Sequence, residues 1–117
     1  MVEAFEEMYD KHLAGLREIL PKIDPNFANR VMYLERKLAD EAVKEPQLIL
    51  TIEYKPNVDM DKKLYDLREV HSLEAEYSDK HNILFAMSRM RLAKVEEISQ
   101  DGDIVSISGK ASPIIRS

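Results

Sequence analysis

The stretch EPQLILTIEYK, residues 45–55, decides the fold, because the period of the apolar residues changes at Pro46. Before this proline, apolar residues recur every three or four positions, which is the spacing of one face of a helix. After it, every second residue of 48–54 is apolar, which is the spacing of one face of a strand. The change predicts a helical pair in residues 1–45 and a sheet in residues 47–109.

Two helices are expected in the first part. The first carries one apolar stripe and should end near Leu20, because Pro21 disfavours helical geometry in the residue before it. Asp24 and Pro25 mark the start of the second helix. An aspartate side chain caps the free amide groups at a helix N-terminus, and a proline suits the first helical position. The second helix is predicted to run to about Lys44.

The second part contains three further runs that are typical of strands. Residues 65–78 alternate and are predicted to form a long strand, residues 83–87 suit a central strand, and residues 104–108 suit the last one. With residues 47–55 they make an antiparallel sheet of about four strands. The sequence therefore predicts a single α+β domain in two layers, with the helical pair packed on the sheet.

An alternative stays open for two of these segments. Met60, Leu64 and Leu67 also fit a helix over residues 59–70, and residues 89–99 match neither template cleanly. If both segments are helices, the order after the helical pair is strand, helix, strand, strand, helix, strand. That order is the ferredoxin-like pattern.

The composition limits the class of protein. Charged residues make up 33% and hydrophobic residues 44%, as in ordinary globular domains, and the net charge is −5. Because cations supply most of the affinity for phosphates, general binding to nucleic acid or to anionic membranes is not expected. Cysteine is absent, which excludes disulfides and thiolate metal ligands. No signal peptide or membrane-spanning run is recognisable, so we expect a cytoplasmic protein.

Glu69 and His71 form the sharpest local group of chemical side chains. On a strand they would project from the same face, where a carboxylate can orient an imidazole for acid–base chemistry. Tyr65 and Tyr77 would share that face and are candidates for lining a ligand pocket. This spacing is common, and a strand end with solvent-facing polar groups is the competing interpretation.

Arg89 and Arg91, together with Lys94, lie in the only locally basic stretch, residues 80–95. They are candidates for contacting an anion or a phosphate, although the acidic residues that follow could neutralise them. The three glycines are isolated, so neither common glycine-rich phosphate loop is present. The sequence indicates no cofactor and no metal site.

No motif dictates a chemistry. The leading hypothesis is a non-catalytic protein-interaction or assembly module that forms a homodimer, because sheet edges and the apolar tail at residues 110–117 offer docking surfaces. The alternative is a small-molecule-binding protein or an acid–base enzyme with a pocket between helices and sheet. A third hypothesis is an anion-binding accessory role for the basic stretch. The tail itself could also fray.

Overall fold

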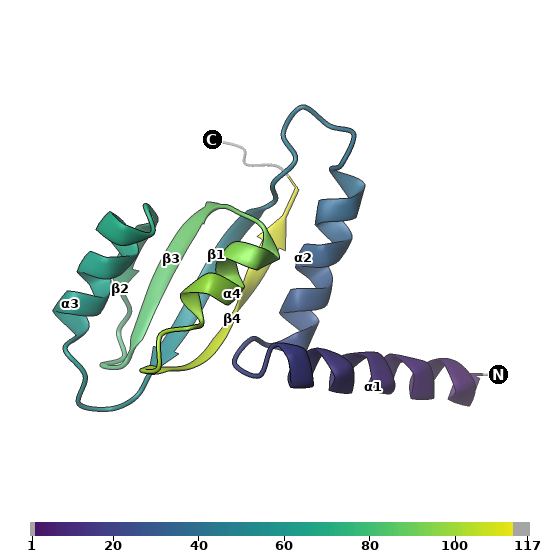
Figure 1. Cartoon of the computed structure of the whole chain (residues 1–117), viewed down its shortest axis with the longest axis horizontal. Helices are drawn as coiled ribbons and strands as arrows, with labels where there is room; N and C mark the ends of the chain where they lie inside the picture. Colours follow the sequence, from purple (N-terminus) through teal and green to yellow (C-terminus); the bar gives the residue numbers. More distant parts are fainter. Residues whose placement is uncertain (1, 114–117) are drawn as a thin grey trace.

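A computed structural model describes residues 2–113 of the chain. In chain order its elements are α1 (Val2–Ile19), α2 (Pro25–Lys37), β1 (Gln47–Tyr54), α3 (Met60–Tyr65), the π-helical segment η1 (Asp66–Val70), β2 (Glu74–Tyr77), β3 (Ile83–Arg89), α4 (Leu92–Ile98) and β4 (Ile104–Ser112) (Figure 1). Two N-terminal helices precede a four-stranded antiparallel sheet. The predicted α+β class is therefore confirmed.

The strand order in the sheet is β2-β3-β1-β4, and all neighbouring strands are antiparallel. After α2 the elements follow the ferredoxin-like order, so the alternative assignment holds for both ambiguous segments. The long strand predicted over residues 65–78 is wrong, because only residues 74–77 of it are extended. Asp59 caps the helix instead, accepting a hydrogen bond from the Lys62 amide at 3.2 Å, and Leu64 is buried beneath it.

One face of the sheet carries the core. Every second residue of β1 is fully buried there, against apolar residues from α2, from the α3–η1 segment and from α4, so all three cover the same face. The inward side chains are Leu48, Leu50, Ile52, Tyr54, Phe27, Val31, Leu64, Leu67, Leu84, Val95, Ile98 and Ile107. Burying one such side chain completely stabilises the fold by about 1.5–3 kcal/mol, so this face holds the domain together.

Helix α2 begins as the sequence predicts and ends earlier. The Phe27 amide donates to Asp24 Oδ2 at 2.9 Å, and Pro25 occupies the first turn. The helix stops at Lys37 and does not reach Lys44, because residues 39–45 are exposed and supply no buried stripe to hold further turns. Beyond the helix, Lys44 Nζ donates back to the carbonyl of Ala39 at 2.7 Å.

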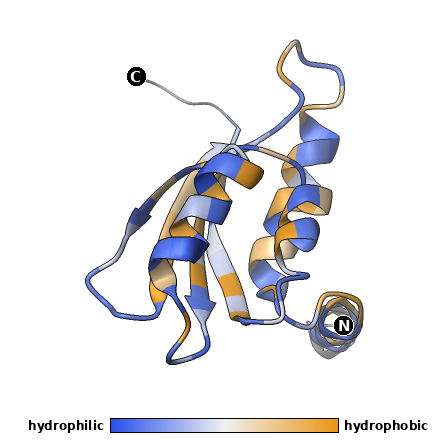
Figure 2. Ribbon diagram, turned by 60° about the vertical axis from the view of Figure 1, so that its left-hand side comes forward, coloured by the Kyte–Doolittle hydropathy of each residue, from blue (hydrophilic) through white to orange (hydrophobic). Residues whose placement is uncertain are grey.

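Helix α1 packs against α2 and projects from the body of the molecule (Figures 1 and 2). Leu16 is buried, whereas Phe5 and Met8 on the same stripe are 69% and 67% exposed. The loop that joins α1 to α2 is fixed to the last strand, since the Ile107 amide donates to Lys22 O at 2.7 Å and Ile107 O accepts from Asp24 at 2.8 Å. Of the two helices, α2 therefore lies on the sheet and α1 extends the layer outward.

Strand β4 continues to Ser112, beyond the predicted end at Ser108. The first residues of the predicted tail thus belong to the sheet, and residues 114–117 lie outside the described part of the chain. Gly109 allows the close pairing with β1, because a Cβ at this position would overlap the carbonyl oxygen of Ile49. No helix within residues 2–113 is long and apolar enough to cross a membrane.

Candidate functional site

The structure divides the six candidate residues of the sequence into two groups. Tyr65 and Glu69 are exposed on the helical segment, so the shared strand face assumed for Glu69 and His71 does not exist. Tyr77 at the end of β2 is also apart from His71. In contrast, Arg89 and Arg91 line one cavity together with His71.

Tyr77 belongs to a separate contact between β2 and α3. Its hydroxyl group donates a hydrogen bond to the carboxylate of Asp61. This hydrogen bond is the main reason why the pKa of Tyr77 lies above its ordinary value. Because both side chains are exposed, the contact fastens a helix to a strand and forms no pocket.

The cavity that the three remaining candidates line has a volume of about 760 Å³. It lies between the turn after η1, the end of β3 and the first turns of α4. Its polar lining includes His71, Arg89, Arg91 and Lys94, and Leu73 and Met90 contribute an apolar wall. This volume falls within the usual range of small-molecule sites.

An unusual backbone places His71 at this cavity. The π-helical turn closes with a hydrogen bond from the His71 amide to Asp66 O at 3.1 Å, and the next residue, Ser72, has a positive φ of 59°. Nδ1 of His71 is buried and has no hydrogen-bond partner in the structure. Buried polar atoms usually have a partner, and strained backbone is often kept for function, so this turn points to a ligand or an ordered water.

The cations around the cavity differ in how they are used. Lys94 Nζ lies 2.9 Å from Glu97 Oε2, and this hydrogen bond lowers the pKa of Glu97. Arg89 donates from one nitrogen to the backbone oxygen of Glu45 at 3.0 Å, and Arg91 is exposed. Neither arginine forms an ion pair with any residue in the range 2–113. Two guanidinium charges therefore remain available at the rim.

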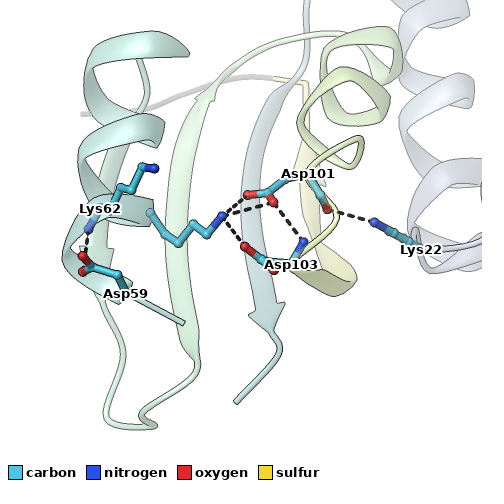
Figure 3. Close-up of polar contacts among 6 residues, drawn as sticks. Lys22, Asp59, Lys62, Asp101 and Asp103 are labelled. Carbon is cyan, nitrogen blue, oxygen red and sulfur yellow. Dashed lines mark hydrogen bonds and ion pairs between the residues drawn. The ribbon is translucent and has the colours of Figure 1, made fainter. Parts of the chain in front are cut away.

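A second cavity, of about 340 Å³, lies on the other side of His71, between the helices and the sheet. Lys63 crosses it from α3 and pairs with Asp101 at 2.9 Å and with Asp103 at 2.8 Å (Figure 3). Lys22 adds a bond from its Nζ to the backbone oxygen of Asp101 at 2.9 Å. This group, here called the Lys63 clasp, joins three segments that are distant in the sequence.

The clasp is internally balanced. Burial opposes the charge of Lys63, but hydrogen bonds to Asp103 and Asp101 outweigh it and raise the pKa of Lys63. Burial likewise opposes the charge of Asp101, yet the bonds from Lys63 and from the Asp103 amide lower the pKa of Asp101. The pKa of the neighbouring Tyr54 is raised, first by burial and then by the charge of Asp101. These groups satisfy one another, which indicates a structural role.

The third candidate region is the face of the sheet that no helix within residues 2–113 covers, here called the open face. Lys110, Ile49, Met87 and Glu74 are successive register partners and form one row across all four strands. Two residues further along β1, toward its C-terminal end, the next row on the same face is Ser108, Thr51, Phe85 and Glu76. Both rows are apolar or neutral in the centre, and β2 contributes acids at one side while β4 contributes a base at the other.

Exposure and shape set the open face apart from an ordinary surface. Ile49 is 44% exposed and Met87 38% exposed, although both lie in the centre of the sheet. Two shallow hollows of about 390 and 440 Å³ meet at Ile49 and Phe85. Contiguous exposed apolar side chains rimmed by polar ones are typical of contact surfaces.

Two further tests bear on the choice among these regions. Within the described residues, no three histidine or carboxylate side chains converge to hold a metal ion. Comparisons with protein-family models, with curated proteins and with solved structures find no match for this chain.

Proposed function

We propose that this protein is a non-catalytic assembly module that forms a homodimer through the open face of its sheet. The observation that supports the proposal is the row Lys110, Ile49, Met87 and Glu74, which reads base, apolar, apolar, acid across the strands. When this row faces a second copy of itself in reversed strand order, the base lies opposite the acid and the apolar residues lie opposite each other. A second copy of the chain is thus the partner that fits this surface.

Symmetry makes the complementarity specific. When two sheets face each other across a two-fold axis parallel to the strands, the strand order reverses while the level along the strands is kept. Lys110 of one copy then lies over Glu74 of the other, and Ile49 lies over Met87. Packed sheets are about 10 Å apart, a gap that a lysine and a glutamate side chain can bridge together.

The second row agrees with the same axis. Thr51 of one copy meets Phe85 of the other, and the Ser108 hydroxyl group can donate to the carboxylate of Glu76. An axis across the strands would instead place the acidic strand β2 over its own copy. Opposed like charges destabilise such a packing, so the axis along the strands is favoured.

The size of the face sets the expected affinity. Four strands about 4.8 Å apart and about 20 Å long give a patch of roughly 400 Å² in plan. Specific interfaces usually bury about 800 Å² of accessible surface on each partner, so this one is at the small end. We therefore expect a dissociation constant in the micromolar range, so that the protein concentration decides which fraction of the chains is dimeric.

Sedimentation equilibrium between about 1 and 500 µM tests the proposal. The wild type should pass from monomer to dimer, while Lys110→Glu and Glu74→Lys should each raise the dissociation constant at least about tenfold. The double variant should regain wild-type affinity, and an equal mixture of the two single variants should form a heterodimer. Lys11→Glu, on exposed α1, is the matched control and should leave the dimer unchanged.

Three results would overturn the proposal. One is a strict monomer at every concentration. Another is a dimer that tolerates both single charge reversals. The third is a dimer that is lost in Phe5→Ser, since Phe5 lies on the exposed stripe of α1 and its importance would move the interface to that helix.

A further inference from the structure

The cavity beside His71 carries an inference that is independent of the dimer. It is bounded by the turn after η1, by the end of β3 and by α4, and none of its lining residues belongs to the two open-face rows that the proposed dimer uses. From its lining we infer that this cavity binds a small organic monophosphate, with the phosphate held by His71 and the two arginines.

The charge balance supports an oxyanion. Glu97 already neutralises Lys94, and Glu45 is a second carboxylate in the lining. Within residues 2–113 the side chain of Arg89 makes one hydrogen bond, from one nitrogen to the backbone oxygen of Glu45. A guanidinium has five N–H donors, so Arg89 keeps several and Arg91 keeps its full set. Paired arginines suit phosphate because the planar fork matches its oxygen atoms. Three cations against two carboxylates leave an excess of positive charge around the cavity, even though the chain is acidic as a whole.

His71 supplies the third contact. Among residues 2–113 its buried Nδ1 atom finds no hydrogen-bond partner, whereas buried polar atoms usually have one. Rotation about χ2 of a histidine is broad and nearly two-fold, so the ring can present either nitrogen to the cavity. A phosphate oxygen would provide the acceptor that the fold does not.

The apolar part of the lining indicates that the ligand is larger than phosphate alone. Leu73, Met90 and Ala93 form an apolar wall next to the cations. This wall would contact the organic part of the ligand. A monophosphate with an apolar or aromatic body therefore fits the lining better than a free inorganic ion does.

NMR spectra of the three imidazole rings test the inference, with phenyl phosphate as the probe and sodium chloride at equal ionic strength as the reference. The signals of His71 should move as phenyl phosphate saturates the site. Those of His12, which contacts Asn29 at 3.0 Å on the N-terminal helices, and of exposed His81 should stay in place. Inorganic phosphate should bind at least about tenfold more weakly, because it cannot use the apolar wall.

Arg91→Gln should raise the dissociation constant for phenyl phosphate at least about tenfold. Arg17→Gln on α1 is the matched control and should bind phenyl phosphate as the wild type does. Unchanged signals of His12 and His81 show that each variant is folded. The inference would be overturned by an unmoved His71 at about 10 mM probe, by equal shifts at all three histidines, or by wild-type affinity in Arg91→Gln. If inorganic phosphate bound as tightly as phenyl phosphate, the inference that the ligand has an organic part would be wrong.

Discussion

The two faces of one sheet differ more than any two other regions of this molecule. Leu50 and Ile49 are neighbours in β1, yet Leu50 has no exposed surface and Ile49 is 44% exposed. The inward side of β1 is wholly apolar apart from a tyrosine hydroxyl group, while on the open face the row through Ile49 orders base, apolar and acid from one strand to the next. The covered face fixes the fold, and the open face carries the contact proposed for a second copy of the chain.

The largest expected effect comes from truncating neighbours on the two faces of β1. Leu50→Ala should lower the free energy of unfolding by about 2–5 kcal/mol, because it opens a cavity in the core. Ile49→Ala should cost less than about 1 kcal/mol in the monomer, since its side chain is already partly in water. Urea unfolding at about 1 µM protein measures both. Equal costs would show that the open face is part of the monomer's core.

The pairing of β1 with β4 supports both faces and is sensitive at Gly109. Gly109→Ala should cost about 1–3 kcal/mol, because its methyl group would push against the carbonyl group of Ile49 and separate the strands. Gly102→Ala is the matched control, since nothing lies within 4 Å of its added atom. Thermal unfolding of both variants measures the difference. A tolerated alanine at position 109 would contradict the close strand pairing.

Charges are excluded from the covered face and meet at its rim, in the Lys63 clasp. The pKa of Asp101 lies below the ordinary value of 3.8, so the stability this carboxylate contributes is complete above that pH and is lost as the pH falls through its folded-state pKa. Between about pH 5 and pH 3, wild type should lose about 1 kcal/mol more stability than Asp101→Asn does. Urea unfolding across this range measures the difference. If the unfolding free energies of wild type and Asp101→Asn fell equally with pH, the clasp would not contribute to the stability.

The smallest effect sharpens the comparison on the open face alone. Thr51→Val should leave the unfolding free energy of the monomer within about 0.5 kcal/mol. It should tighten the dimer a few-fold, because a valine meets Phe85 of the second copy better than a hydroxyl group does. Sedimentation equilibrium gives the change. Weaker dimerisation in this variant would place position 51 outside the interface.

Much of the fold could be predicted from local pattern. The cap at Asp24 and the alternation of β1 rest on neighbouring residues, and both are confirmed. The alternation from Tyr65 to Tyr77 was misleading, because the same residues satisfy a helical spacing and neither tyrosine is buried. Only the burial of Leu64 and Leu67 in the folded core decides between the two.

The candidate sites depend on contacts that no local pattern contains. Arg89 and Arg91 could be chosen by charge, but their meeting with His71 requires the turn after η1. The Lys63 clasp joins residues 38 positions apart, and no local pattern links Lys63 to the turn at Asp101 and Gly102. The open-face rows form only if the strands pair in one particular register, and this register cannot be read from the sequence.

The attachment of the N-terminal loop to β4 has a consequence for how the chain is made. Lys22 and its acceptor Asp101 are separated by 79 residues, and Ile107, which anchors the same loop, follows later still. At about 5–20 residues per second, a ribosome needs roughly 4–16 s to connect these positions. Throughout that interval α2 lacks β4, the strand against which it packs. The nascent chain should therefore be a client for holding chaperones until its final strand emerges.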